Sequence, residues 1–281
     1  MGSLLGLPAS WRATSGSPGG IPDVITTQFE LGKRSGFTPV VILGFADDSP
    51  RGPVLTIDWS DPAQRDAFRR MAVAIADKYH PRFLGIGNEV NRIWMVNPQA
   101  FDLFVAAYAE IYDAVKAVSP RTQVFTVFQL ELMKGGGFLV DGARSRPPQW
   151  DLVERFAGKL DLVAFTTYPF LDYKAPADIP DDYFREAAAR VRRPIALTEV
   201  GWPSRPIAGA EASGYGGTPE EQAEFVRRLF TLLAGVRPSF VLWSFPHDIG
   251  PGPSVAFASV SLRENDGTAK PALEVWRQLT R

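Results

Sequence analysis

The sequence has no cysteine among its 281 residues. This absence excludes disulfide bonds, thiolate metal sites and a cysteine nucleophile. Histidine is almost as scarce, because the chain has only His80 and His247, which do not have the spacing of a zinc site. The sequence also contains no Gly-x-x-x-x-Gly-Lys-Ser/Thr phosphate loop and no dinucleotide fingerprint. We therefore expect neither a metal nor a cofactor.

The chain likewise lacks an excess of charge and a long apolar run. Its formal net charge of −1 gives no electrostatic reason to expect nucleic acid or an anionic membrane as a partner. No stretch approaches the ~20 apolar residues that a membrane span needs. Gly6 and Pro8 interrupt the apolar residues near the start, so we expect no signal peptide in this chain.

What the chain does have is an alternation of short apolar runs with amphipathic helical patterns. The runs lie near 39–45, 83–87, 122–129, 160–167, 194–199 and 239–245, and the helical patterns over 62–79, 98–118, 181–192, 219–234 and 271–279. Such alternation is typical of a parallel sheet, and the length suits one barrel of roughly 250 residues. We expect an α/β fold, a (β/α)8 TIM barrel, as a single domain over residues 1–281.

The front of the chain is short for such a barrel. Counted back from the last run, the six strands are numbers three to eight, and two further βα units at about 30 residues each would not fit into residues 1–38. Leu4–Leu7 is a poor strand pattern, and residues 28–35 make a short helix. We therefore expect an incomplete N-terminal part in which the first strand is missing.

Two glutamates each close one of the apolar runs. Glu89 occurs in Gly-Asn-Glu-Val after the run 83–87, and Glu199 occurs in Thr-Glu-Val-Gly-Trp-Pro-Ser after the run that starts at Pro194. In a closed parallel barrel all strand ends of one polarity lie at one face, so the two can converge although 199 − 89 = 110 positions separate them. Hydrolysis of a glycosidic bond needs such a pair, because one carboxyl group protonates the leaving oxygen while the other attacks the sugar or activates water.

These strings resemble those of the retaining glycoside hydrolases of clan A, which are (β/α)8 barrels, and the resemblance covers the chain from about Pro39 to its end. The segment that contains Glu199 is most similar to the nucleophile segment of the family 17 β-1,3-glucanases and, more loosely, to that of the family 53 β-1,4-galactanases. The continuation Ser204-Arg205-Pro206 departs from the family 17 pattern. The resemblance implies that Glu89 is the general acid/base on strand four and that Glu199 is the nucleophile on strand seven.

The same resemblance implies several substrate-binding residues at neighbouring strand ends. Asn88 would hydrogen-bond the sugar 2-hydroxyl, and Tyr168 lies where the clan often places a hydroxyl near the nucleophile. Trp243 falls at the strand-eight position whose indole commonly forms the floor of the cleaved sugar's site. Three further candidates follow strands at the same face: Trp202, Gln129 and His247.

Most of these residues also have an ordinary structural interpretation. Glu89 alone, without its partner, would be an exposed carboxylate at a strand end. An indole between apolar neighbours, such as that of Trp243, usually packs in a core. Tyr168 can cover a helix, Trp202 can shape the turn after strand seven, and His247 can be a solvated loop residue.

The sequence therefore predicts a retaining endo-β-glycosidase that hydrolyses a β-linked polysaccharide, a β-glucan or a β-galactan, by double displacement. The alternative is a catalytically impaired or truncated barrel that binds carbohydrate. A barrel that uses the glutamates as metal ligands would need more partners than Glu131, Asp248 and His247 provide. The sugar and its linkage, endo or exo attack, transglycosylation and the oligomeric state are left open. A polysaccharide substrate favours an extracellular location.

Overall fold

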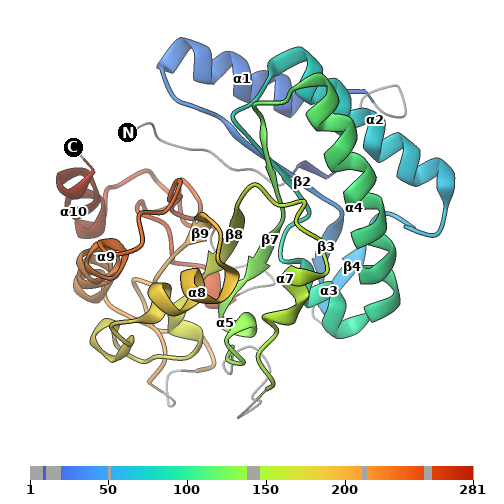
Figure 1. The fold of residues 1–281 in the computed structure, drawn as a ribbon. Helices are drawn as coiled ribbons and strands as arrows, with labels where there is room; N and C mark the ends of the chain where they lie inside the picture. Colours follow the sequence, from blue (N-terminus) through green and yellow to red (C-terminus); the bar gives the residue numbers. More distant parts are fainter. Residues whose placement is uncertain are drawn as a thin grey trace. The chain divides into compact units, whose positions relative to one another are not determined.

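The computed structural model describes residues 9–10, 20–49, 52–137, 146–210, 214–249 and 255–280. The chain forms two compact units, whose helices and strands are labelled in Figure 1. The N-terminal unit comprises Gly2–Gln129 and Asp151–Ala164, and the C-terminal unit comprises Leu130–Trp150 and Phe165–Arg281. The division falls inside strand β8 (Val163–Thr167), which therefore contributes to both units.

A parallel sheet forms the centre of the N-terminal unit. Its strands are, in spatial order, β1 (Ala9–Ser10), β2 (Val40–Gly44), β5 (Phe83–Ile86) and β6 (Gln123–Phe125). Val40 lies opposite Phe83, which in turn lies opposite Gln123, so the three longer strands start in register. Every residue of β2 and β5 is buried, as expected for parallel strands that are covered on both faces.

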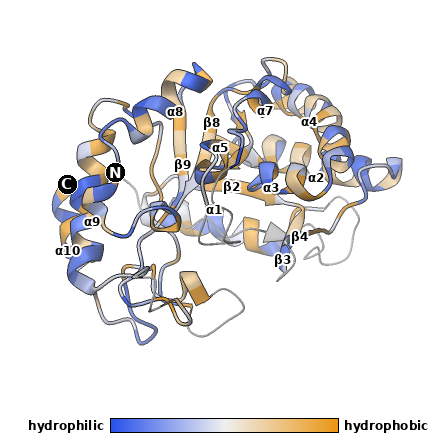
Figure 2. Ribbon diagram, turned by 90° about the horizontal axis from the view of Figure 1, so that it is seen from below, coloured by the Kyte–Doolittle hydropathy of each residue, from blue (hydrophilic) through white to orange (hydrophobic). Residues whose placement is uncertain are grey.

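Helices α1 (Asp23–Ser35), α2 (Pro62–Tyr79), α3 (Val90–Val96), α4 (Pro98–Val118) and α7 (Asp151–Glu154) belong to the same unit. The side chain of Asp61 accepts a hydrogen bond of 2.8 Å from the Ala63 N–H, and a proline at the first position of α2 needs no donor, so the helix begins there. The helices carry both hydrophilic and hydrophobic residues, as Figure 2 shows for α4. On α2 the buried residues follow the expected helical spacing: Ala67, Phe68, Met71, Ala72 and Ile75.

An antiparallel hairpin, which the apolar pattern does not predict, follows β2. It consists of β3 (Ala46–Ser49) and β4 (Gly52–Leu55), with Asp47 paired to Val54. Its two aspartates are exposed, so the segment has none of the apolar alternation by which a strand is recognised. The hairpin matters for function because it carries Asp48 to the candidate site.

The C-terminal unit contains the end of β8 and strand β9 (Ile195–Val200), which follow β7 (Val127–Gln129) in the strand order β7-β8-β9. Leu197 of β9 also forms a parallel bridge with Val241. The helices are α5 (Leu130–Met133), α8 (Tyr183–Val191), α9 (Pro219–Leu233) and α10 (Pro271–Leu279), with short 3-10 turns at Pro169–Leu171, Pro176–Asp178 and Val255–Phe257. Helices α9 and α10 share a core around Val226 and Val275.

The expected elements are largely found. Five of the six apolar runs contain strands, the sixth contributes the bridge at Val241, and the five expected helices are present within two residues of their ends. Helix α1 is longer than expected. Strand β1 pairs parallel with β2 through Ala9 and Leu43, so a strand precedes β2, while Leu4–Leu7 lies outside the described residues. The missing first strand and the single domain over 1–281 stay predictions.

Candidate functional site

The N-terminal unit places Asn88 and Glu89, both half-buried, directly after β5. Gly87 has φ 86°, and a Cβ there would lie 2.6 Å from the Val90 side chain and 2.9 Å from Phe45, so only glycine fits this turn. Glu89 itself has φ 48°, in the left-handed region that residues other than glycine rarely occupy. Strained residues of this kind concentrate at functional sites. The turn directs the glutamate out of the sheet at the start of α3.

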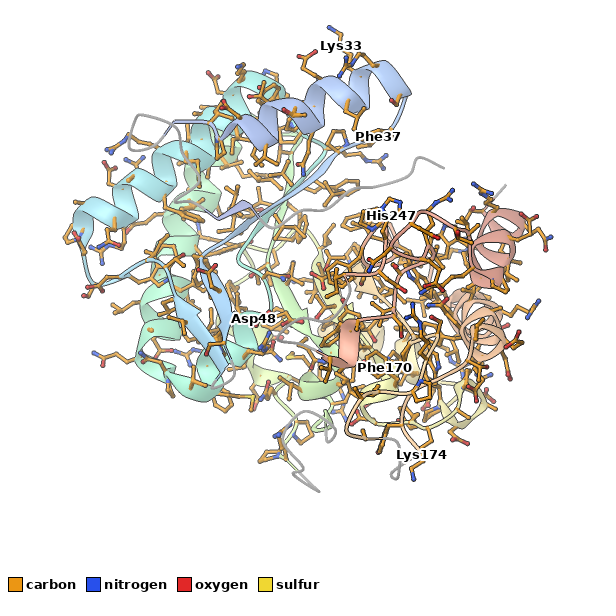
Figure 3. The ribbon with its side chains drawn as sticks, turned by 180° about the vertical axis from the view of Figure 1, so that it is seen from behind. Lys33, Phe37, Asp48, Phe170, Lys174 and His247 are labelled. Carbon is orange, nitrogen blue, oxygen red and sulfur yellow. The ribbon has the colours of Figure 1, made fainter. Side chains whose placement is uncertain are left out.

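Arg92, one turn into α3, holds the Glu89 carboxylate. Its Nη1 lies 2.5 Å from Glu89 Oε2, and its Nη2 lies 2.8 Å from Oδ1 of Asp48, which Figure 3 shows on the hairpin. Burial lowers the pKa of Arg92, but the carboxylates of Glu89 and Asp48 outweigh this effect and raise that pKa above its usual value. A permanent cation therefore links the strand-end glutamate to the hairpin. No local pattern in the sequence indicates this link.

A hollow of about 200 Å³ opens beside this ion pair. Its wall combines carboxylates, an amide and a guanidinium group with a few apolar side chains, a mixture that suits the hydroxyl groups and ring faces of a sugar. Asn88 and Glu89 both line it, so the structure brings these two predicted residues to one cavity. The lining residues are Gly44, Phe45, Ala46, Asp47, Asp48, Pro53, Thr56, Asn88, Glu89 and Arg92.

Gln129, at the end of β7, is tied to the same helix. The Asn91 side chain of α3 donates to the Gln129 carbonyl oxygen at 3.0 Å and accepts from the Gln129 N–H at 2.8 Å. Both residues are buried. This reciprocal pair fixes the end of β7 relative to the turn that carries Glu89, while substrate binding by Gln129 stays a prediction.

The C-terminal unit places Glu199 on β9, where it is half-buried and the other strand residues are buried. The Tyr168 hydroxyl donates to Glu199 Oε2 at 2.7 Å and also lies 2.7 Å from Ser244 Oγ. Because the phenol has one hydrogen, Ser244 is the donor in the second bond. A chain of hydroxyl groups thus runs from Ser244 through Tyr168 to Glu199 and holds the carboxylate in one orientation.

The ring of Tyr168 is itself packed by aromatic residues. Phe257 lies edge-on to it at 4.6 Å between centroids, and Phe170 lies at 6.0 Å. On another side, a Cβ at Gly201 would lie 3.1 Å from the ring, so the glycine lets β9 approach the tyrosine closely. This packing leaves Tyr168 only 3% exposed, with its hydroxyl toward Glu199.

Glu131, on α5, lies behind Tyr168 and is completely buried. Its Oε1 accepts three hydrogen bonds, from Thr167 Oγ1 at 2.8 Å, from the Tyr168 N–H at 2.9 Å and from Tyr183 Oη at 2.7 Å. Burial and, to a lesser extent, the charge of Asp172 raise the pKa of Glu131 to about 7, against the opposing effect of the bond from Tyr183. A buried carboxyl group that titrates near neutrality next to a strand end is a feature of functional sites.

Two tryptophans that we expected at the sugar site pack against aromatic residues of the unit. Trp202 has no exposed surface and stacks on Phe225 with ring centroids 5.1 Å apart. Trp243 donates its indole N–H to the Val260 carbonyl oxygen at 2.8 Å and lies edge-on to Trp276 of α10. In an extended chain, neighbouring side chains point to opposite sides. Ser244 faces Tyr168, so its neighbour Trp243 faces the helices. Core packing accounts for Trp202, while Trp243 is half-buried, and contact of either tryptophan with substrate stays a prediction.

His247 is exposed, as Figure 3 shows, and its Nε2 lies near the turn at Gly267. Its contact with substrate stays a prediction. Phe245, which the sequence analysis did not single out, is 39% exposed and has φ 58° directly after Ser244. An exposed aromatic ring in a strained backbone beside the hydroxyl chain is a further candidate for contact with a sugar.

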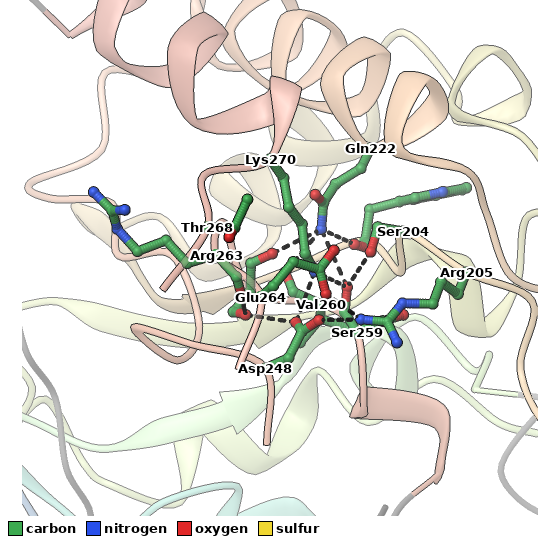
Figure 4. A network of polar contacts seen from close by, with 12 residues as sticks. Ser204, Arg205, Gln222, Asp248, Ser259, Val260, Arg263, Glu264, Thr268 and Lys270 are labelled. Carbon is green, nitrogen blue, oxygen red and sulfur yellow. Dashed lines mark hydrogen bonds and ion pairs between the residues drawn. The ribbon is translucent and has the colours of Figure 1, made fainter. Parts of the chain in front are cut away.

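A buried ion-pair network anchors the loop after β9 (Figure 4). Lys270 Nζ lies 2.7 Å from Asp248 Oδ1, with both side chains at most 2% exposed, and Arg205 reaches the other oxygen of Asp248 at 2.8 Å. Burial lowers the pKa of Lys270, and the bond to Asp248 opposes that shift. Gln222 Nε2 donates to the Trp202 carbonyl oxygen at 2.7 Å. Arg205, the residue at which the sequence departs from the family 17 pattern, is thus held by an ion pair with Asp248.

Two kinds of feature are not found in the part of the chain that the structure describes. No group of three or more histidine, aspartate or glutamate side chains there is arranged to hold a metal ion. Among the same residues, no helix combines the length and the apolar character needed to cross a membrane.

No family model and no curated protein matches the sequence. Solved structures match its fold. A structure of fungal β-1,4-galactanases has a TM-score of 0.66 and 14% identity and aligns over 98% of this chain and 86% of its own. The glycoside hydrolase family 53 (GH53) catalytic domain of Ignisphaera aggregans has a TM-score of 0.66 and 18% identity, and it aligns over 98% of this chain and 84% of its own. A family 39 glycoside hydrolase from Bacteroides cellulosilyticus WH2 has a TM-score of 0.69 and 16% identity, and it aligns over 99% of this chain and 57% of its own.

These likenesses, each below 20% identity, concern the fold. They extend over nearly the whole chain, and they name family 53, to which we noted a resemblance, but not family 17. The chain therefore has the α/β fold of the (β/α)8 type that is shared by the clan A glycoside hydrolases.

Proposed function

We propose that the protein is a retaining β-glycosidase in which Glu199 is the nucleophile and Glu89 is the general acid/base. The observation that carries this proposal is the hydrogen bond from Tyr168 to Glu199 Oε2. A donated hydrogen bond favours the ionised form of a carboxylate, and holding one oxygen directs the other toward the anomeric carbon. The donor is itself fixed by Ser244, so the orientation exists before substrate binds.

Glu89 has the opposite requirement, because it must first give a proton to the leaving oxygen and then take one from water. Arg92 Nη1 lies 2.5 Å from Glu89 Oε2 and fixes that oxygen of the carboxyl group. The guanidinium group is shared with Asp48, so its charge is partly neutralised by a second carboxylate. Arg92 thereby ties the proposed acid/base to the hairpin that carries Asp48.

Asn88 and the hollow beside it supply the place for a sugar. We assign to Asn88 the hydrogen bond to the 2-hydroxyl, an interaction that strengthens in the transition state. The substrate we propose is a β-linked polysaccharide attacked internally, with β-1,4-galactan as the first candidate because β-1,4-galactanases share this fold along nearly the whole chain. β-Glucan is the second candidate, on the motif that contains Glu199.

Release of reducing sugar from β-1,4-galactan, β-1,3-glucan, mixed-linkage glucan and β-mannan tests the activity. We expect release from one polymer by the wild type, none by Glu199→Gln, and wild-type release by Glu110→Gln, a matched change of an exposed glutamate on α4. Binding of a polymer without release, by a folded protein, would favour a carbohydrate-binding barrel instead.

The retaining mechanism has its own test. Glu89→Ala with azide should convert an activated aryl β-glycoside into the β-glycosyl azide, since azide then attacks the glycosyl-Glu199 intermediate, whereas Glu199→Ala should give the α-azide by direct attack. A crystal structure should show the two carboxyl groups about 5–5.5 Å apart, against roughly 6.5–9.5 Å in inverting enzymes. An α-azide from Glu89→Ala would contradict the assignment of roles.

A further inference from the structure

We propose that Glu131 is a positioning residue of this site, which fixes the end of β8 and thereby the Tyr168 hydroxyl that orients Glu199. This inference rests on the proposed function. Glu131 contacts neither Glu199 nor the hollow beside Glu89 in any bond described above. It acts, in our proposal, only through the residue that holds the nucleophile.

The geometry of the contact carries the inference. A single oxygen atom, Glu131 Oε1, receives the side chain of Thr167, the last residue of β8, the backbone N–H of Tyr168, and the hydroxyl of Tyr183, the first residue of α8. One buried atom on α5 therefore joins the end of a strand to the start of a helix. Tyr168 leaves β8 at this point, and its hydroxyl is bound to Glu199 at 2.7 Å.

The choice of a carboxyl group at this position needs an explanation, because burying one is unfavourable unless it is well hydrogen-bonded. Glu131 is completely buried, and an aliphatic side chain would avoid that cost but would leave three donors without their acceptor. All three bonds end on Oε1, so a proton on Oε2 leaves them in place. The contact is thus preserved in both ionisation states of Glu131, and an amide can reproduce it.

Asp172 and the glycines that follow α5 also hold the segment that carries Glu131. Asp172 Oδ1 accepts from the Gly137 N–H at 2.5 Å, and a Cβ at Gly136 would lie 2.1 Å from Asp172 Oδ2. Gly136 donates its own N–H to the Glu131 carbonyl oxygen at 2.7 Å. The glycine run that follows α5 therefore permits a close approach between the segment carrying Glu131 and the segment that follows Tyr168.

A double-mutant cycle tests the proposal. We would measure kcat and KM for Glu131→Gln and Glu131→Leu, each in the wild type and in Tyr168→Phe. Glu131→Gln should stay within about threefold of the wild type, since its amide oxygen replaces Oε1. Glu131→Leu should lower kcat about as much as Tyr168→Phe does, by roughly 10- to 100-fold, with little change in KM, and should cause no further loss in the Tyr168→Phe background. Losses that multiply, or a wild-type kcat for Glu131→Leu, would overturn the inference.

Tyr183→Phe provides a milder variant that leaves the buried carboxyl group in place and removes one of its three donors. It should lower kcat by a few-fold, and this effect should also disappear in Tyr168→Phe. The matched control is Tyr215→Phe, because Tyr215 lies over Lys174 at 5.5 Å and makes no bond described here with Glu131. Equal kcat for the Tyr183 and Tyr215 variants would count against the proposal.

Amide hydrogen exchange separates this inference from the proposed function. The Tyr168 N–H is bound to Glu131 whether or not the protein cleaves sugars, so Glu131→Leu should speed exchange in a peptide spanning 165–170 at least about tenfold relative to Glu131→Gln. Equal exchange in the two variants would overturn the role of Glu131. Absence of any polymer cleavage by the wild type would instead overturn the proposed function and leave the exchange result to stand by itself.

Discussion

The two glutamates differ in how their units hold them. In the N-terminal unit Glu89 sits in a left-handed turn after β5 and is held by the cation Arg92, which it shares with Asp48. In the C-terminal unit Glu199 sits on a regular strand and is held by a neutral hydroxyl, Tyr168. The first environment fixes one oxygen by charge, and the second fixes one oxygen by a donor without charge.

This difference matches two chemical roles. A nucleophile must remain ionised and present one oxygen along one line, which a strand and a fixed donor achieve. An acid/base must exchange a proton in each half of the reaction, and we propose this role for Glu89, whose carboxylate shares the cation Arg92 with Asp48. We therefore propose the two roles from the surroundings of each carboxylate, and this proposal agrees with the order of the motifs in the chain.

The largest effect should come from removing the nucleophile. Glu199→Gln keeps the shape of the side chain but cannot form a glycosyl ester, so we expect kcat to fall by about 10⁴-fold or more on every substrate. Thermal unfolding should change little, because Glu199 is half-buried and an amide can still accept from Tyr168. Rates on polymer and on an aryl glycoside, beside those of Glu110→Gln, provide the measurement. Substantial residual activity would place the nucleophile elsewhere.

Glu89→Gln should differ from Glu199→Gln in its dependence on the leaving group. Loss of the acid should lower kcat about 10³-fold on a polysaccharide, because its leaving oxygen needs a proton. It should lower kcat far less on an aryl glycoside with an acidic phenol. A comparison of kcat across phenols of different acidity checks this. A uniform loss, independent of the phenol, would contradict the acid/base role and remove the distinction between the two units.

Tyr168→Phe should have a smaller effect, because it removes the hydroxyl but leaves the carboxylate. A hydrogen bond to a charged group contributes about 1.5–3 kcal/mol, so we expect kcat to fall roughly 10- to 100-fold while KM changes little. The ring keeps its packing against Phe257 and Phe170, and stability should be nearly unchanged. A matched Tyr215→Phe variant serves as the control. An unchanged kcat would show that Glu199 does not depend on this donor.

The parts of the fold that the sequence predicted are those encoded by local signals. The start of α2 follows from Asp61 and Pro62, and that of α9 from Thr218 and Pro219, because a cap acts over three or four residues. The two glutamates were recognisable for a related reason, since each directly follows an apolar run. The hairpin that carries Asp48 was missed because its exposed strands have no apolar alternation.

The remaining errors concern contacts between distant residues. Ser244 binds a tyrosine 76 positions away, and nothing near either residue encodes that pair. The run that contains Trp243 is apolar from Phe240 to Trp243, without alternation, so the sequence does not show which of its side chains face the nucleophile and which face the helices. A shift of one residue exchanges the two faces of a strand. For this reason Ser244 contacts Tyr168, whereas its neighbour Trp243 packs against Trp276.

The smallest expected effect concerns stability and distinguishes Glu131 from both catalytic candidates. Its pKa in the folded protein, about 7, lies above the ordinary 4.5, so the folded state binds its proton more tightly than the unfolded state does. Its ionisation should therefore lower the free energy of unfolding as pH rises from about 4.5 to about 7, by at most roughly 3 kcal/mol, with no further change above that range. Glu131→Gln cannot ionise, so its free energy of unfolding should not show this decline, whereas that of Glu110→Gln should show it. Denaturant unfolding at pH 4.5, 6 and 8 measures the difference, and parallel curves for the wild type and Glu131→Gln would show that the buried carboxyl group does not titrate in this range.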